Sequence, residues 1–290
     1  MTERALVAGA AGALGREVVL SMKERGFYVR ALGRDRARLE ATCNVADERV
    51  VADALRPETL RGVCDGMTMV FSCVGASVIP MPQYGFATFS KVDYPANLNL
   101  IREAERSGIQ RFGYVSTFAT PNLKHLDFVR GHELVVEALK RSSMDYRVIR
   151  PTGLFSAMEK ILLVASRGIV PEFQGGLART NPIHDADLAE FCVDALMGDK
   201  RELDVGGPEP LTRREIAEQA YSAIGKTLKT RRVPVSVLSG AGLALRPLCP
   251  RVGHLFTFIA KILVQDVVAP CYGERTIGKF FQESAGKMRS

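Results

Sequence analysis

Apolar stretches of strand length alternate with stretches of helical periodicity along the first half of the chain. Residues 5–8 are continuously apolar and a glycine-rich turn follows them, which is typical of a buried strand. Over residues 16–25, Val18, Val19 and Met22 share one helical face, and Gly26 marks the end of the helix. The pattern also predicts strands near residues 28–32, 49–53, 67–75, 111–117 and 145–151, and helices over 96–107 and 129–142. The alternation indicates an α/β protein built on a doubly wound parallel sheet.

The pattern loosens after Pro151. A helix is predicted near residues 185–198, and a strand followed by a Gly-Pro loop precedes a further helix. Thr212, with Glu215 three residues later, predicts a capping box at the start of that helix. We therefore expect residues 1–155 to form the sheet-bearing core. Residues 156–290 are expected to form a smaller, mostly helical C-terminal lobe of the same compact unit.

The segment of residues 252–270 is apolar enough to raise the question of a membrane. It contains His254, Lys261, Gln265 and Asp266, which are too many polar groups for a helix that crosses a bilayer. The segment therefore predicts an amphipathic helix that packs on its own protein or on a second copy, as in a homodimer, without stable membrane insertion. Association with a membrane is the less favoured alternative.

Composition narrows the class of protein. Hydrophobic residues make up 47% of the chain and charged residues 24%, as in globular domains. The net charge of +7 suits anionic small molecules or nucleic acid, but the absence of Trp argues against a base-stacking surface, so no nucleic-acid partner is predicted. The six cysteines form no CxxC pair and do not cluster with histidine, so no metal site is predicted. Unpaired cysteines and the lack of a signal-peptide pattern favour the cytoplasm.

Three glycines lie between the first predicted strand and the first predicted helix. Gly9, Gly12 and Gly15 form the pattern G-x-x-G-x-x-G. A pyrophosphate binds at such a turn because the backbone can approach it without Cβ atoms and the helix N-terminus faces it. The context of the three glycines therefore predicts a dinucleotide-binding Rossmann fold. A tight strand-to-helix turn without a ligand is the alternative.

The end of the second strand bears on the choice of cofactor. An acidic residue there would bind the ribose hydroxyls of NAD, whereas an arginine accommodates the 2′-phosphate of NADP. Arg34 follows this strand, with Arg30, Arg36 and Arg38 nearby, and Asp35 comes one residue later. Guanidinium groups bind phosphate through paired, charge-assisted hydrogen bonds. NADP is therefore favoured over NAD, with a solvated basic helix start as the other interpretation.

Several motifs together resemble the atypical, NmrA-like branch of the short-chain dehydrogenase/reductase superfamily. They are GAAGALGR, VADALRPETL, VFSCVG, VDYPANLNLIREAERSGI, RFGYVST and DYRVIRPTGLFS. The resemblance implies that the glycine loop holds pyrophosphate and that other residues flank the adenine, line the nucleotide or lie by the nicotinamide. The implied cofactor-binding residues are Gly9, Ala11, Gly12, Leu14, Gly15, Arg34, Asp53, Ala54, Cys73, Val74, Gly75 and Pro151.

The catalytic pattern of that family is incomplete in this chain. Active members use Tyr-x-x-x-Lys on one helix face, where the ammonium lowers the pKa of the phenol so that it can exchange a proton, and a serine at the end of the fifth strand. Ser116 is present, but Phe128 takes the tyrosine position and His132 the lysine position. Phenylalanine cannot transfer a proton, so the usual mechanism is absent.

His132 and Ser116 are the remaining catalytic candidates. A histidine can move a proton near neutral pH or bond a ribose hydroxyl, but His132 also lies on an apolar helical stripe and could simply pack there. Tyr114 points to the same sheet face as Ser116, a position more typical of a core residue. The predicted pocket for an apolar substrate comprises Phe118, Phe128, Phe155 and Met158.

Two functions fit these features. The first is an NADP-dependent oxidoreductase that transfers hydride between the nicotinamide and a small apolar substrate of the carbonyl or enone type. The second is a non-catalytic NADP-binding regulator, which the missing Tyr and Lys favour. A sugar-nucleotide epimerase or dehydratase is less favoured, because that chemistry also relies on the missing tyrosine.

Overall fold

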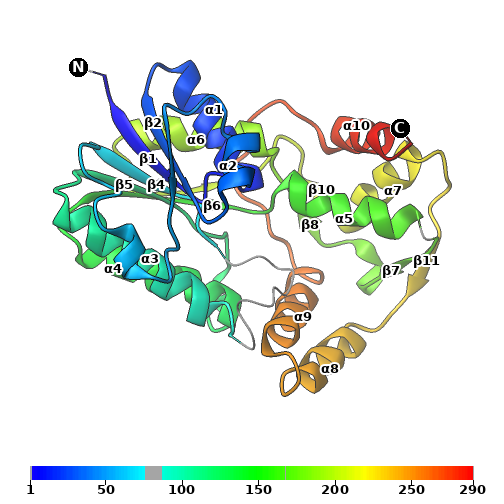
Figure 1. The fold of residues 1–290 in the computed structure, drawn as a ribbon. Coiled ribbons are helices and arrows are strands. Elements are labelled where there is room, and N and C mark those ends of the chain that lie inside the picture. The colour runs from blue at the N-terminus through cyan, green and yellow to red at the C-terminus, as the bar shows by residue number, and fades with distance from the viewer. Residues whose placement is uncertain (1, 76–86, 167, 290) are drawn as a thin grey trace. The chain divides into compact units, whose positions relative to one another are not determined.

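The computed structural model describes residues 2–75, 87–166 and 168–289 (Figure 1). Its contacts divide the chain into two compact units, and the division is not a single cut. The first unit contains Met1–Thr117, Asp127–Arg150 and Leu188–Leu203, and the second contains Phe118–Leu126, Pro151–Asp187 and Asp204–Ser290. A segment near residue 190 thus returns to the first unit after the chain has entered the second.

The first unit is built on a seven-stranded sheet with the order β3-β2-β1-β4-β5-β6-β9. Strands β1 to β6 pair in parallel, and the strand order reverses between β1 and β4. The predicted doubly wound α/β fold is confirmed. The strands are β1 Arg4–Ala8, β2 Tyr28–Gly33, β3 Glu48–Val51, β4 Met69–Ser72, β5 Arg111–Val115, β6 Asp145–Pro151 and β9 Glu202–Val205.

Helices connect these strands and supply much of the core. They are α1 Ala13–Glu24, α2 Arg36–Thr42, the 3-10 helix η1 Pro57–Leu60, α3 Ser90–Arg106, α4 Asp127–Arg141 and α6 Asp185–Met197. Helix α3 begins six residues before the predicted start at Ala96, and Pro95 lies inside it. The side chain of Asp127, from the start of α4, accepts a hydrogen bond from the Phe89 backbone N–H at 2.9 Å. This tertiary cap stabilises an early first turn that the local sequence does not indicate.

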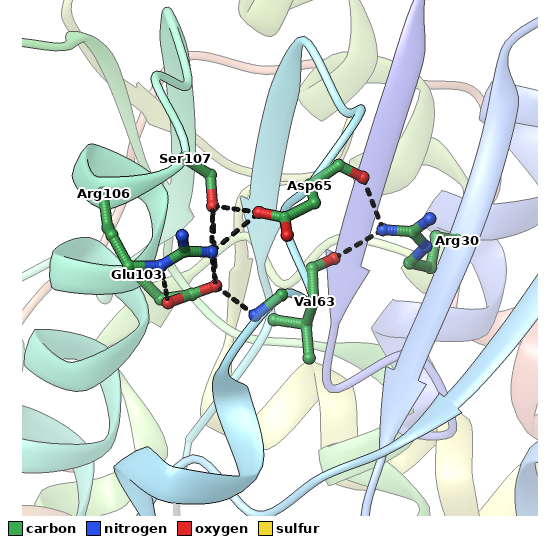
Figure 2. Close-up of polar contacts among 7 residues, drawn as sticks. Arg30, Val63, Asp65, Glu103, Arg106 and Ser107 are labelled. Carbon is green, nitrogen blue, oxygen red and sulfur yellow. Dashed lines mark hydrogen bonds and ion pairs between the residues drawn. The ribbon is translucent and has the colours of Figure 1, made fainter.

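A polar cluster ties β2 to the segment before β4 and to α3 (Figure 2). Arg30 donates from Nη1 to the backbone oxygens of Val63 and Asp65, at 2.9 and 3.0 Å. Arg106 bonds the carboxylates of Glu103 and Asp65, at 2.8 and 2.7 Å. The hydrogen bond from Arg106 lowers the pKa of Glu103, which is buried. Arg30 is therefore engaged in holding the fold together.

The second unit has its own apolar core. Phe155, Leu162, Ile216 and Phe281 are buried in one cluster formed by α5, α7 and α10. The capping box predicted at Thr212 is present. The elements of this unit are the 3-10 helix η3 Pro121–Leu123, α5 Phe155–Ser166, β7 Val170–Glu172, the 3-10 helix η4 Gln174–Gly176, β8 Arg179–Thr180, β10 Leu211–Thr212, α7 Arg213–Ala223, β11 Thr230–Arg232, α8 Val235–Leu245, α9 Pro250–Ile262 and α10 Ile277–Arg289.

The apolar segment near the C-terminus forms a helical hairpin of α8 and α9, which pack side by side (Figure 1). Gly242 and Gly253 face each other at the crossing: a Cβ on Gly253 would lie 2.6 Å from the Gly242 carbonyl oxygen. Only glycine lets the two helix backbones approach so closely. Across residues 2–75, 87–166 and 168–289, every helix is too short or too polar to span a bilayer.

Candidate nucleotide-binding site

The loop between β1 and α1 has no room for side chains at its three glycines. Gly9 has a φ of +76°, and a Cβ there would lie 2.9 Å from the Cys73 carbonyl oxygen. A Cβ on Gly15 would overlap the Gly9 carbonyl oxygen, and one on Gly12 would lie 3.2 Å from the same oxygen. All three glycines of the motif therefore meet backbone where other residues would place a side chain.

The loop leaves the N-terminus of α1 open for an anion. Gly9 and Ala10 donate to the Leu32 carbonyl oxygen at 3.0 and 3.1 Å, which anchors the loop on β2. Gly12 is the N-cap residue and supplies no side-chain cap, so the first N–H groups of α1 have no such partner. Ala11 lies half-buried in this loop, and the side chain of Leu14 is buried beneath it. The residues present fit the pyrophosphate of a dinucleotide.

The end of β2 carries the residues that bear on the adenosine ribose. Arg34 follows β2 and is exposed, as are Arg36 and Arg38. Asp35 is the N-cap of α2, and its Oδ1 accepts a hydrogen bond from the Arg38 backbone N–H at 3.1 Å. Its carboxylate therefore has a structural role in α2. Arg30 is occupied by the cluster of Figure 2.

The residues implied to flank the nucleotide follow β3 and β4. Asp53 is half-buried and accepts from the Leu55 backbone N–H at 3.0 Å, so its carboxylate closes a turn. The Ala54 carbonyl oxygen accepts from Asn99 Nδ2 at 2.9 Å. Cys73 and Val74 come directly after β4, and Gly75 is the last described residue of this loop. These segments lie at the same sheet edge as the glycine loop, because β2, β1 and β4 run in parallel.

Asn97 on α3 is a site residue that the sequence analysis missed. Its side chain is fully buried; Nδ2 donates to the Val74 carbonyl oxygen at 3.0 Å, and Oδ1 accepts from Ser72 Oγ at 2.7 Å. It thus fixes the segment after β4. The available signal was a polar residue between Ala96 and Leu100 on an otherwise apolar helix face.

The candidate catalytic residues lie at β5 and α4. Ser116 follows β5, its backbone N–H donates to the Ile149 oxygen at 2.8 Å, and its buried hydroxyl has no hydrogen-bond partner within the described part of the chain. His132 is buried, and its Nδ1 lies 2.6 Å from the Tyr114 hydroxyl. Burial lowers the pKa of His132 to about 4. The imidazole is therefore neutral at pH 7.

Aromatic side chains pack against His132. The ring of Phe128 meets those of His132 and Phe89 edge to face, with centroids 5.1 Å apart in each pair. Burial raises the pKa of Tyr114 well above its usual value, so the phenol stays protonated. Phe128, His132 and Tyr114 thus pack against one another. The hydroxyl group of Tyr114, on β5, contacts the imidazole of His132.

The predicted substrate-pocket residues are distributed over the two units. Phe128 belongs to the first, whereas Phe118, Phe155 and Met158 belong to the second. Phe155 is buried and meets the ring of His184 edge to face, with a centroid distance of 5.5 Å, and Met158 packs against the apolar cluster that contains Phe155. Pro151 ends β6, and its carbonyl oxygen accepts from the Phe118 backbone N–H at 3.0 Å. A common pocket for the four residues stays a prediction.

Residues 2–75, 87–166 and 168–289 contain no group of three His, Cys, Asp or Glu side chains arranged to hold a metal ion. Burial raises the pKa of the Cys73 thiol to about 12, so this cysteine is not a thiolate at neutral pH.

Residues 9–199 match the model of the NAD(P)H-binding family, and the protein belongs to that family. Together with the relatives below, this match confirms the resemblance to atypical short-chain dehydrogenases/reductases. Divinyl chlorophyllide a 8-vinyl-reductase of Zea mays is 27% identical, over 96% of this chain and 78% of that protein. Photosystem II assembly factor Ycf39 of Guillardia theta is 25% identical, over 80% of this chain and 74% of that protein.

A solved structure shares the fold. NADPH-dependent quinone oxidoreductase QOR2 of Escherichia coli, determined with NADPH, superposes with a TM-score of 0.73 and 15% sequence identity. The match covers 99% of this chain and 100% of the other. The chain is therefore an NAD(P)H-binding protein with a Rossmann fold.

Proposed function

We propose that the protein is an NADPH-dependent reductase that delivers hydride to a small apolar substrate of the carbonyl or enone type. The glycine loop carries this proposal, because an open helix N-terminus and three sterically required glycines form a pyrophosphate cradle. The names of a vinyl reductase among the relatives and a quinone oxidoreductase among the similar structures support a conjugated, apolar acceptor.

Each residue has a separate task in this proposal. The backbone N–H groups around Gly12 bind the pyrophosphate, and Arg34 binds the 2′-phosphate of the adenosine ribose. The buried hydroxyl of Ser116, which has no hydrogen-bond partner within the described residues, donates to the substrate oxygen as negative charge develops there. The bound nicotinamide supplies the hydride.

The proton must come from a group other than a phenol at position 128. His132 is neutral, and if Tyr114 donates to Nδ1, the imidazole carries its own proton on Nε2. We propose that this Nε2–H makes the imidazole a hydrogen-bond donor in the site. Because a neutral imidazole that lost this proton would become an imidazolate, solvent or the substrate supplies the proton that the reduced product takes up.

Cofactor choice tests the first part of the proposal. NADPH should bind more tightly than NADH, because Asp35 is committed to capping α2 and Arg34 is a cation at the end of β2. Arg34→Ala should weaken NADPH binding about 10- to 150-fold, as for a charge-assisted hydrogen bond, and leave NADH unchanged. Titration calorimetry measures both, with the exposed Arg102→Ala as the matched control. Equal affinities of the parent protein for the two cofactors would refute the assignment to NADPH.

Turnover tests the chemistry. NADPH oxidation is followed against quinones, enones and aldehydes, and Ser116→Ala should lower kcat about 10²-fold while NADPH still binds. His132→Ala should lower kcat by about 10²- to 10³-fold if the Nε2–H donates a hydrogen bond to the substrate as negative charge develops there. An unchanged kcat in that variant would show that the imidazole only packs in the fold. Phe128→Tyr should gain little activity, because no lysine is present to lower the pKa of the new phenol.

A non-catalytic regulator that binds NADPH is the second candidate. It is favoured by Phe128 in the tyrosine position and by the buried, neutral state of His132. One relative is named as an assembly factor rather than an enzyme. Tight NADPH binding without turnover of any acceptor in the panel would favour this candidate over the reductase.

A further inference from the structure

The positive charge of the protein is concentrated in one segment. Residues 219–265 contain no Asp or Glu, although the chain as a whole carries 32 of them. Their seven cations match the net charge of the whole chain, +7, so the rest of the protein is electrically balanced. The cations are Lys226, Lys229, Arg231, Arg232, Arg246, Arg251 and Lys261.

Helix α8 lies within this segment and has an unusual exposed face. It contains no charged residue, and Val237, Leu243 and Leu248 just beyond its end are 58%, 65% and 72% exposed. Gly240 and Ala244 are exposed between them, at the three- and four-residue spacing of one helical stripe. The opposite side is used by Gly242, which packs on α9. A solvent-facing stripe of a globular protein is normally polar, so this apolar stripe is a candidate contact surface.

Exposed cations flank the apolar stripe along the chain. Arg231 and Arg232 end β11, three residues before α8 begins, and both are exposed. The carboxylate of Glu172 lies 4.0 Å from Arg232 Nε and is also bonded by Arg214. Lys261 is exposed in the last turn of α9. Along residues 219–265, apolar and cationic residues thus occur together with no acidic residue between them in the sequence.

We propose that the α8–α9 hairpin and the adjoining β11 rest on an anionic lipid surface as a peripheral contact. The apolar stripe would enter the boundary of the acyl chains, while the cations pair with lipid headgroups. Helices of 11 and 13 residues are about 16 and 20 Å long, shorter than the roughly 30 Å hydrocarbon core. The proposal departs from the sequence-based expectation that this segment packs only on protein, and it is independent of the proposed reductase activity.

Charge decides between a lipid surface and a second copy of the chain. In a two-fold symmetric dimer through α8, the same surface meets itself, so the exposed cations that flank α8, namely Arg231, Arg232 and Lys261, would approach their own copies. Like charges brought together in this way oppose association. An anionic bilayer offers both the apolar region and the complementary charge.

Vesicle flotation of the full chain tests the proposal. The vesicles contain phosphatidylcholine alone or with about 30 mol% phosphatidylglycerol, at an ionic strength of about 0.1 M. The parent protein should float with the anionic vesicles only. Leu243→Glu should lower the partition coefficient about tenfold or more, and Arg231→Gln with Arg232→Gln about 25-fold.

Matched controls separate this surface from general stickiness. Leu177→Glu removes an equally exposed leucine, at 71%, outside α8, and Arg102→Gln with Arg130→Gln removes two exposed cations of the first unit. Both controls should float like the parent protein, and circular dichroism checks that every variant is folded.

Four results would overturn the proposal. The parent protein could remain unbound to anionic vesicles, or the α8 and β11 variants could float as well as the controls. It could also form a dimer by light scattering that Leu243→Glu dissociates, which would assign the stripe to a second copy. Binding to a nucleic acid that is weakened by the arginine changes but not by Leu243→Glu would likewise replace the lipid assignment.

Discussion

Acidification should lower the free energy of unfolding of the protein, and part of this loss should come from His132. The imidazole is 8% exposed and bonded through Nδ1 to Tyr114, and burial lowers its pKa to about 4. Groups that face Tyr114 on this side of the fold are Asp93, Glu133 and Arg150, so the site is not purely apolar. In the unfolded chain the pKa of a histidine is about 6.5.

The sign of the effect follows from these two pKa values. Between pH 6.5 and 4, the unfolded chain takes up a proton at His132 while the folded protein does not, so stability falls as the pH falls. Above pH 6.5 both states are neutral at His132, and its contribution to the free energy of unfolding does not depend on pH. The loss between pH 7 and pH 5 is about 2 kcal/mol, and it approaches about 3 kcal/mol at pH 4.

Urea denaturation at a series of pH values measures this loss. Carboxylates also contribute to acid destabilisation, so the quantity of interest is the parent protein minus His132→Gln, whose difference should change by about 2 kcal/mol between pH 7 and 5. The exposed His125→Gln is the control and should show no such change. NMR of the four histidines provides an independent pKa. A folded-state pKa of His132 near 6.5, with a flat difference curve, would refute the reasoning.

Three further predictions rest on local geometry. Gly15→Ala should abolish detectable NADPH binding and lower the melting temperature, because the new Cβ would overlap the Gly9 carbonyl oxygen. Gly286 is exposed with open space around it, so the control Gly286→Ala should instead stabilise α10 by up to about 1 kcal/mol. Asn97→Ala should lower the free energy of unfolding in urea by about 2–4 kcal/mol, because Ser72 and Val74 would lose their hydrogen bonds to Asn97. A loss no larger than that of a surface substitution would contradict this role of Asn97. Asp35→Ala should lower stability by about 1 kcal/mol through loss of the α2 cap, whereas unchanged stability would show that the cap contributes nothing.

Much of the fold could be predicted because its signals are local. The β1 strand, the glycine turn and α1 follow one another within residues 4–24, and each has its own pattern of apolar residues or glycines. The capping box at Thr212 likewise depends on two residues that are three apart. Such features form wherever the surrounding chain permits, so sequence order alone carries the information.

Other features depend on residues that are distant in the sequence. The early start of α3 requires Asp127, whose carboxylate reaches the backbone at Phe89 from another helix. The role of Asn97 appears only when Ser72 and Val74 of the neighbouring strand end are in place. Hydrophobic periodicity does not specify which polar groups meet across elements, so these contacts were beyond prediction.

By itself, the sequence determined the parallel α/β architecture and the glycine motif between β1 and α1, because each follows from residue types at fixed spacings. Phe128 and His132 in place of Tyr-x-x-x-Lys were inferred from the resemblance to short-chain dehydrogenases/reductases. The tertiary structure decided the state of those residues. It placed His132 against Tyr114 in a buried group that keeps the imidazole neutral, and it committed Asp35 to the cap of α2. Protonation and hydrogen-bond partnership depend on burial and on neighbours brought together by folding, and the chain acquires both only when its elements pack.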